Sequence, residues 1–337
     1  MIRRRQFIAG LGVTAASVSF DLHSPAAAAE PQPEATTLRL QRPVKTLPGM
    51  CVAPQLVADD LLKLEGFTDV QYVATDTPQR AAGLAGGEID LAMGFVGGWI
   101  KQVDAGHPIV ILTGVHVGCY ALFASERIRT IGDLRGKTVG VTELGSSRHL
   151  FLVSLMSYVG LDPNKEVTFV TKPQAESVEL FTGGKLDAYL AFSEEVPELR
   201  KRKVGHVIMS STEEHPWSQY FCCVLAGNRK FVRAHPVATK RAVRAILKAS
   251  SVCALEPDRV ARSVVDRGFT TAPYEDVRDT IKSLPYTKWR VYDPEDSVRF
   301  YALRLREAGM IKSSPQKLIA QGTDWRFLNE LKKELKG

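Results

Sequence analysis

Two stretches of the chain repeat one pattern of apolar and polar positions. Residues 81–95 (AAGLAGGEIDLAMGF) and 178–192 (VELFTGGKLDAYLAF) each place a short apolar helix before a Gly-Gly pair, an Asp and an apolar strand that ends in Phe. A Gly pair ends a helix in the left-handed conformation at little steric cost and lets the chain turn directly into a strand. A supersecondary unit that occurs twice predicts two similar lobes.

The similarity extends backwards from both copies as strand, loop, helix and strand. The expected elements are residues 37–40, 49–54, 53–64 and 70–73 in the first half, and 137–142, 143–147, 147–159 and 167–170 in the second. Alternating strands and helices predict an α/β fold with parallel sheets covered on both faces. In such sheets ligands bind at the carboxyl ends of the strands, so two facing sheets predict a binding cleft between them.

The rest of the chain predicts how the lobes are connected. Residues 117–124 and 217–226 read as strands that cross between the lobes, and the chain after Asn228 reads as helical. The expected helices are residues 236–255, 257–267, 273–284, 293–308 and 324–336. They lack matching strands and must pack on the first lobe or brace both. We therefore expect one lobe of residues 36–118 plus 227–337 and a second lobe of residues 119–226.

Residues 1–29 resemble an export signal. Arg4-Arg5 followed by Gln6, Phe7 and Ile8 is similar to the twin-arginine (Tat) pattern, and small residues at 26–29 offer cleavage after Ala28 or Ala29. A basic or amphipathic tail is the alternative. Residues 30–35 then form a tether. No Cys follows the apolar run, so the prediction is a periplasmic protein that is not a lipoprotein.

Composition narrows the classes of partner. The 337 residues include 45% hydrophobic and 24% charged side chains, as in ordinary globular proteins, and the formal net charge is +7. This mildly basic balance suits small anions and gives no argument for nucleic acid. The five cysteines have no C-x-x-C spacing, so the sequence predicts neither a metal site nor a cofactor; they are Cys51, Cys119, Cys222, Cys223 and Cys253.

Four segments together carry a family resemblance. They are residues 131–142 (IGDLRGKTVGVT), the Gly145-Ser146-Ser147 turn, residues 158–163 (YVGLDP) and residues 183–188 (GGKLDA). In combination they resemble the nitrate, sulfonate and taurine group of ABC-transporter substrate-binding proteins. The resemblance implies a type II periplasmic binding fold of two Rossmann-like lobes joined by two hinge strands, with a helical C-terminal extension. It also implies a monomer that delivers one solute to ABC permease and ATPase subunits.

The main candidate site is a helix start in the second lobe. Gly145, Ser146 and Ser147 offer hydroxyls beside free helix amides, which together can hold an anionic or carbonyl oxygen. Plain helix capping is the alternative. The corresponding place in the first lobe is Val96-Gly97-Gly98, whose amides can reach the other end of the ligand.

Other candidates lie near the same strand ends. Ser193 is a plausible hydrogen-bond donor to the ligand. Glu194 and Glu195 fit contact with a cationic or hydrogen-bonding ligand and an acidic helix start in solvent equally well. Thr46 is expected at the mouth of the cleft, together with Arg42 and Lys45. His149 is a ligand candidate, although a histidine in the first turn of a helix more often packs or caps than binds a ligand. For Arg148, a surface position is more typical than a salt bridge to an anion.

Two pairs of residues invite a chemical interpretation. Asp90 and Asp187 form a matched pair of carboxylates, but their equivalence in the two copies favours a structural role, with each accepting backbone amides at its Gly-Gly turn. Cys119 and Cys222 fall in the two crossing strands, which neighbour each other in the resembling fold. A disulfide across the hinge is therefore a hypothesis, to be checked by counting free thiols in the unfolded protein.

The sequence as a whole predicts a solute-binding protein rather than an enzyme. The expected solute is small and anionic, such as a sulfonate, a carboxylate or a nitrate-like ion, or else pyrimidine-like. The resemblance also reaches thiamine-pyrimidine precursor binders and pyrimidine synthases, although the Cys-rich motif of those synthases is absent. An enzyme on the same fold, of pyrimidine-synthase or lyase type, and an extracytoplasmic sensor remain the alternatives.

Overall fold

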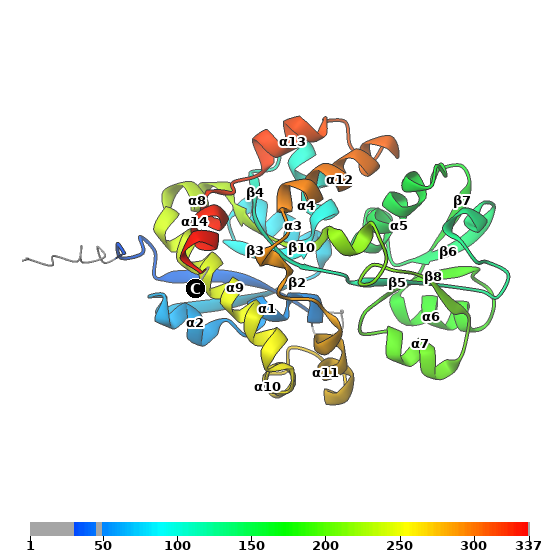
Figure 1. Cartoon of the computed structure of the whole chain (residues 1–337), viewed down its shortest axis with the longest axis horizontal. Helices are drawn as coiled ribbons and strands as arrows, with labels where there is room; N and C mark the ends of the chain where they lie inside the picture. Colours follow the sequence, from blue (N-terminus) through cyan, green and yellow to red (C-terminus); the bar gives the residue numbers. More distant parts are fainter. Residues whose placement is uncertain (1–29, 45–48, 336–337) are drawn as a thin grey trace, which may run out of the picture. The chain divides into compact units, whose positions relative to one another are not determined.

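Two five-stranded sheets form the framework of the chain (Figure 1). The computed structural model describes residues 30–44 and 49–335, and residues 32–337 form one compact unit. The first sheet has the order β2 (Asp69–Thr75), β1 (Thr37–Pro43), β3 (Leu91–Phe95), β10 (Phe221–Asn228) and β4 (Ile109–Val117). The second has the order β7 (Val167–Thr171), β6 (Lys137–Val141), β8 (Ala188–Phe192), β5 (Tyr120–Ala124) and β9 (His206–Ser210). We call each sheet with its covering helices a lobe.

The sheets are mixed rather than wholly parallel, because each contains an inserted antiparallel strand. In the first, β10 runs antiparallel to both β3 and β4; in the second, β5 runs antiparallel to β8. Both inserted strands belong to segments predicted to cross between lobes. The crossing at residues 117–124 is also not continuous, since Gly118 adopts φ of 72° between β4 and β5.

Helices of the first 210 residues cover the sheets much as expected. They are α1 (Ala53–Leu56), α2 (Asp59–Leu64), α3 (Thr77–Gly86), α4 (Val96–Asp104), α5 (Ser147–Tyr158), α6 (Gln174–Thr182) and α7 (Val196–Arg202). The single helix expected at residues 53–64 is broken after Leu56. The Leu56 carbonyl accepts hydrogen bonds from the Arg267 guanidinium and the Tyr72 hydroxyl at 2.9 and 3.4 Å, and the helix does not continue.

The C-terminal part is helical, as predicted. It contains α8 (Arg229–Ala234), α9 (Pro236–Leu255), α10 (Pro257–Asp266), α11 (Tyr274–Ser283), α12 (Pro294–Glu307), α13 (Pro315–Gly322) and α14 (Arg326–Glu334). Helix α9 packs on α1 and α2, whereas α12 contacts α4 of the first lobe and α5 of the second (Figure 1). The helices therefore both cover the first lobe and brace the two together. The expected elements did not include α8, α13 or strand β9. Helix α7 was covered only by the interpretation of Glu194 and Glu195 as a helix start.

The repeated turns have the geometry that the Gly pairs predict. Helix α3 ends at Gly87 with φ of 85°, and the turn after α6 places Gly184 at φ of 70°. The structural role of the two aspartates is confirmed, but their partners differ from the prediction. Asp90 accepts from the backbone N–H of Arg39 at 2.7 Å, and Asp187 accepts from that of Thr138 at 2.8 Å. Each carboxylate thus joins its turn to the neighbouring strand, β1 or β6.

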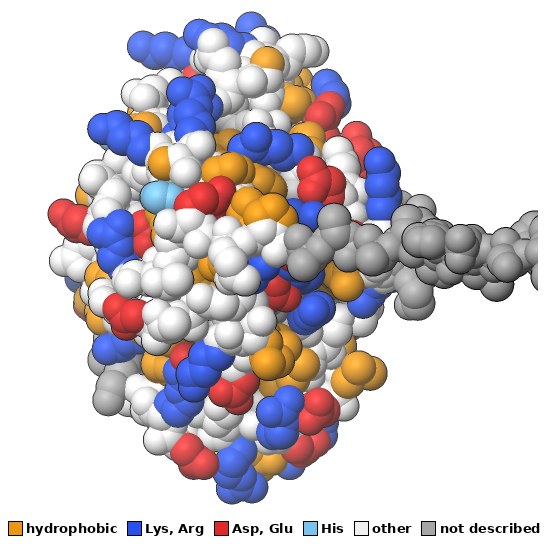
Figure 2. Space-filling model, turned by 90° about the vertical axis from the view of Figure 1, so that its left-hand side faces the viewer, with side chains coloured by type: hydrophobic (Ala, Val, Ile, Leu, Met, Phe, Trp, Pro, Cys, Tyr) orange, Lys and Arg blue, Asp and Glu red, His pale blue; other side chains and the backbone are white. Residues whose placement is uncertain are grey.

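The surface carries charges of both signs. On the face drawn in Figure 2, Lys and Arg side chains are interspersed with Asp and Glu rather than gathered in one patch. Among the described residues, no helix is long and apolar enough to cross a membrane.

Candidate functional site

A cavity of about 90 Å³ lies where the strands of both sheets end. Its lining comprises Gln41, Pro43, Cys51, Val52, Thr75, Asp76, Arg80, Gly94, Phe95, Cys119, Tyr120, Thr142, Ser146, Ser147, Arg148, Gln174, Phe192 and Cys223. The carboxyl ends of β1, β2, β3, β6 and β8 all contribute, as does the segment after β7. This is the edge at which α/β sheets place their ligands.

The first-lobe wall contains buried polar atoms that lack partners. In the described part of the chain, Gln41 Oε1, Thr75 Oγ1 and Arg80 Nε are buried and make no hydrogen bond, and all three residues line this cavity. Buried polar groups in native proteins are nearly always paired. The three atoms therefore indicate a place where a polar ligand completes the hydrogen bonding.

Arg80 supplies positive charge to the cavity. Its guanidinium carbon lies 5.1 Å from the centre of the Trp99 ring, and no carboxylate pairs with it among the described residues. Burial lowers the pKa of Arg80, but an arginine stays charged at neutral pH. Asp76 also lines the cavity, with one oxygen held by the backbone N–H of Gln79 at the start of α3. Arg80 is half-buried with its Nε fully buried, and a cation in this position without a counterion favours an anionic ligand.

The second-lobe wall is the start of α5, as the sequence predicted. The Ser146 hydroxyl donates to the Glu143 carbonyl at 2.7 Å and accepts from the His149 backbone N–H at 3.3 Å, so it acts as a cap. Ser147 lies beside the Tyr120 hydroxyl and lines the cavity. Of the two serines, Ser147 and the adjacent helix amides are the better placed to meet a ligand.

The other predicted residues lie around the cavity rather than on its lining. Gly98 and Gly145 line an adjoining pocket that shares Arg80, Ser146 and Ser147 with the cavity. At the start of α4, the Phe95 ring packs over Gly97, where an added Cβ would lie 2.6 Å from it; Phe95, not Val96 or Gly97, faces the cavity. Ser193 lines a separate pocket, and Thr46 lies outside the described residues.

His149 has a structural position. Its Nδ1 accepts from the Gly145 backbone N–H at 2.9 Å, and its ring packs edge-on against Phe169. Burial, and secondarily the charge of Lys101, lower the pKa of His149 to about 4. The neutral imidazole thus shapes the loop before α5, and His149 itself is not on the cavity lining.

The interpretation of Arg148 as a surface side chain is wrong. It is 2% exposed and forms an ion pair with Glu195 at 2.6 Å, which is itself buried. Glu195 also accepts from the Phe192 backbone N–H at 2.7 Å, and Glu194 accepts from that of Met50 at 2.6 Å. The two glutamates therefore do not form an acidic helix start in solvent. They hold the second-lobe wall together and tie it to the first lobe.

Cysteines meet at the crossing, but Cys119 and Cys222 do not form the expected disulfide. All five are free thiols, and the Cys119 sulfur lies 3.6 Å from that of Cys223. The register of β10 against β4 shifts between Phe221 and Cys223, and it is Cys223 rather than Cys222 whose sulfur lies beside that of Cys119. Hydrogen bonds from Cys119, Cys222 and Cys51 hold the pKa of the Cys223 thiol well below its usual range.

Sequence reasoning missed the residues of the first-lobe wall. Gln41 and Thr75 lie at or near the ends of β1 and β2, so the rule that ligands lie at strand ends could have found them. Arg80 had no comparable signal, since it lies inside α3 among polar and small residues. The Cys cluster joins positions far apart in the sequence, which no spacing motif describes.

Comparison with known structures identifies the fold. NrtA, the periplasmic nitrate-binding protein of Synechocystis PCC 6803, superimposes with a TM-score of 0.73 at 15% identity, over 91% of this chain and 90% of that one. SsuA, an alkanesulfonate-binding protein of Xanthomonas axonopodis pv. citri bound to MOPS, has a TM-score of 0.65 at 18% identity, over 83% and 96%. A DszB variant in complex with biphenyl-2-sulfinic acid has a TM-score of 0.60 at 13% identity, over 89% and 100%.

These likenesses confirm the predicted periplasmic binding protein fold with its C-terminal helices. No curated protein matches the sequence. A family description does match: residues 61–260 fit "NMT1/THI5 like", which confirms the resemblance found in the sequence motifs. The match covers more than half of the 337 residues, and the chain therefore belongs to the NMT1/THI5-like family.

Proposed function

We propose that this protein is the solute-binding component of an ABC importer and that it binds a small oxyanion in the cavity between the two sheets. The observation that carries the proposal is a pair of buried hydrogen-bond donors without partners on the first-lobe wall, Arg80 Nε and the Thr75 hydroxyl. A carboxylate, sulfonate or nitrate group would accept from Arg80, while the amides at the start of α5 approach from the other lobe.

The chemistry of the structural relatives supports the same ligand class. NrtA is a nitrate-binding protein, the SsuA structure is bound to MOPS, which is a sulfonate, and the DszB variant is bound to biphenyl-2-sulfinic acid. The three ligands share a compact group of oxygen atoms that carries negative charge. The cavity of about 90 Å³ has room for one such anionic group.

Binding measurements with matched anions test the proposal. Nitrate, an alkanesulfonate, an arylsulfinate and a short carboxylate would each be titrated by calorimetry, with uracil as a neutral control. We expect at least one anion to bind with a stoichiometry of one. The Arg80→Gln substitution should lower the affinity for that anion by roughly 10- to 100-fold, since a hydrogen bond to a charged group contributes about 1.5–3 kcal/mol.

The control is Arg127→Gln, because Arg127 is exposed and lies outside the cavity lining. It removes the same charge and should leave the affinity unchanged. Equal losses in both variants would indicate a general effect of net charge, and binding of uracil alone would contradict the proposed ligand class.

The enzyme alternative has one observation in its favour, since thiols of Cys51, Cys119 and Cys223 face the same cavity. Mass spectrometry of the solute after prolonged incubation separates the two functions. A solute recovered unchanged supports transport, whereas catalytic conversion would make the protein an enzyme.

Export to the periplasm by the twin-arginine route belongs to the same proposal. It is supported by the Arg4-Arg5 motif, and replacing both residues by Lys should retain the protein in the cytoplasm. Delivery to a permease and an ATPase is expected of such a protein. Lobe boundaries near residues 118 and 227 remain a prediction.

A further inference from the structure

Three thiols from distant parts of the chain meet at the cavity. Cys51 lies in the 3-10 turn Met50–Val52, Cys119 in the link between β4 and β5, and Cys223 in β10. Their sulfur atoms all lie within 4.8 Å of one another, and the closest printed pair, Cys119 and Cys223, is separated by 3.6 Å. All three residues line the cavity.

These separations match those around one metal ion. Zinc–thiolate bonds are about 2.3 Å long, which places two sulfurs of a tetrahedral site about 3.8 Å apart. The sulfurs can reach this arrangement with shifts of about 1 Å or less. Thiolates are preferred ligands of soft and borderline ions such as Zn²⁺.

The segment that carries Cys51 is held in place by other residues. Glu194 accepts from the Met50 backbone N–H at 2.6 Å, and the Tyr286 hydroxyl donates to the Met50 carbonyl at 2.8 Å. His116 Nε2 lies 2.7 Å from the Cys51 carbonyl oxygen. The three-thiol arrangement is therefore supported by side chains from both lobes and from the C-terminal part.

The charge of the surroundings suits a bound metal thiolate. Three thiolates around a divalent ion carry a net charge of −1, and Arg80, which pairs with no carboxylate in the described residues, lines the same cavity. The cavity also leaves a fourth coordination position open to water or to a small anion.

We propose that Cys51, Cys119 and Cys223 bind one divalent d¹⁰ metal ion, Zn²⁺ being the natural candidate, at the floor of the cavity. Each thiol loses its proton to solvent as its sulfur bonds to the metal, and no oxidant or reductant is required. The inference does not rest on the proposed transport function, since it concerns the cavity floor whatever the solute is.

Cadmium titration of the reduced, metal-free protein tests the site, because thiolate-to-cadmium charge transfer is visible in the ultraviolet. We expect the absorbance to rise until one equivalent of Cd²⁺ has been added and then to stay constant. We also expect Zn²⁺ to compete for the same site. Cys51→Ser, Cys119→Ser and Cys223→Ser should each lose this high-affinity signal.

Cys253→Ser is the matched control, because Cys253 is buried like Cys119 and Cys223 but lies on α9 in a different core cluster. It should bind Cd²⁺ like the unaltered protein. Thermal unfolding of the metal-free variants shows whether each one folds; a folded Cys119→Ser protein that still gives the full charge-transfer signal would overturn the site. So would a Cd²⁺ signal that fails to saturate at one equivalent, or three rather than five thiols in the unfolded, unreduced protein, which would mean a disulfide.

Discussion

Arg80 and Arg148 line the same cavity but differ in their partners. Arg148 pairs with the buried Glu195, whereas Arg80 faces thiols and unpaired polar atoms without a carboxylate among the described residues. The positive charge of Arg148 is therefore already used within the fold. The charge of Arg80 is the one available to a ligand.

The two arginines should consequently respond differently to the same substitution. Arg148→Met leaves the Glu195 carboxylate buried without its partner and is expected to cost about 3–5 kcal/mol of unfolding free energy. Arg80→Met removes a half-buried cation that has no carboxylate partner among the described residues, and it should change stability by about 1 kcal/mol or less, in either direction. Urea unfolding of the ligand-free proteins measures both, and equal losses would contradict the assignment.

His149 makes stability depend on pH. Its pKa of about 4 in the folded protein lies below the ordinary value of 6.5, so the unfolded chain binds the proton more readily. Stability should therefore fall as pH drops from about 6.5 to about 4, with a contribution of roughly 2 kcal/mol from this residue. Its Nδ1 acceptor position can be reproduced by a Gln side chain.

The difference in unfolding free energy between the unaltered protein and His149→Gln isolates this contribution. That difference should change over the stated pH window and be flat above about pH 7. A constant difference from pH 4 to 7 would mean that the imidazole is not held neutral.

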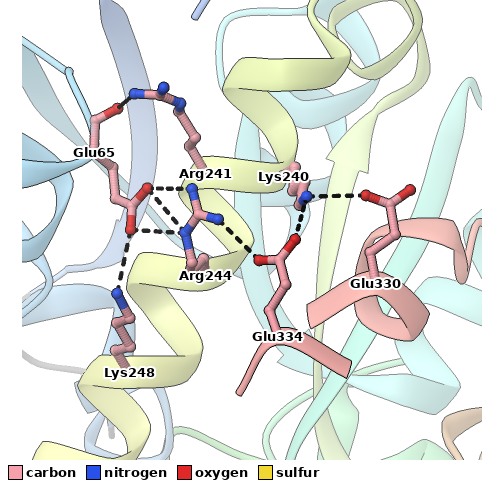
Figure 3. Close-up of polar contacts among 7 residues, drawn as sticks. All are labelled: Glu65, Lys240, Arg241, Arg244, Lys248, Glu330 and Glu334. Atoms are coloured by element: carbon pink, nitrogen blue, oxygen red, sulfur yellow. Dashed lines mark hydrogen bonds and ion pairs between the residues drawn. The ribbon is translucent and has the colours of Figure 1, made fainter. Parts of the chain in front are cut away.

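At the scale of elements, charged side chains join α2, α9 and α14 (Figure 3). Arg244 on α9 lies between Glu65 at 2.6 Å and Glu334 at 3.1 Å, and Lys240 contacts Glu330 at 3.0 Å. Arg241 adds a hydrogen bond to the Glu65 carbonyl at 2.7 Å. The end of α2 and the C-terminal helix are thereby both fixed to one helix of the C-terminal part.

Glu65→Gln tests this network. The Glu65 side chain is only 10% exposed, so loss of its charge should cost about 2 kcal/mol and loosen the end of α2. Asp60→Asn in the same helix is the control, because its ion pair with Lys63 is exposed and should contribute less than about 1 kcal/mol. Unfolding curves for both variants measure the two losses of unfolding free energy. Equal losses would show that the network around Glu65 stabilises the protein no more than an exposed ion pair does.

The elements that the sequence predicts well are those with a local cause. Gly87 and Gly184 determine their turns through backbone conformation, and the buried strand β4 follows from an apolar run. The break after Leu56 could not be predicted, because it depends on Tyr72 and Arg267, which come close only in the folded chain. The same distinction applies to the candidate site. The capped start of α5 has a local cause and could be predicted, whereas Arg80 and the three thiols come together only through tertiary structure.

On the scale of the whole molecule, Gly118 marks the passage from the first sheet to the second. It adopts φ of +72°, and a Cβ added there would lie 2.9 Å from the backbone Cα of Thr212. Thr212 follows β9, so the passage is packed against the second lobe. A glycine is required here by both conformation and space.

Gly118→Ala should therefore destabilise the protein by about 3 kcal/mol, from backbone strain and overpacking together. Gly136→Ala provides the comparison, since Gly136 has nearly the same φ, +71°, but no heavy atom within 4 Å of the added Cβ. It should cost about 1 kcal/mol. Thermal unfolding measures both; if the two losses are equal, packing against Thr212 contributes nothing.

The insertion of β10 between β3 and β4 has a consequence for synthesis on the ribosome. All five strands of the second sheet lie between residues 120 and 210, so they can pair as soon as that stretch has emerged. The first sheet starts earlier but waits for residues 221–228, and until then β3 and β4 present unpaired edges. The half of the molecule that is translated first is thus the half that is completed last.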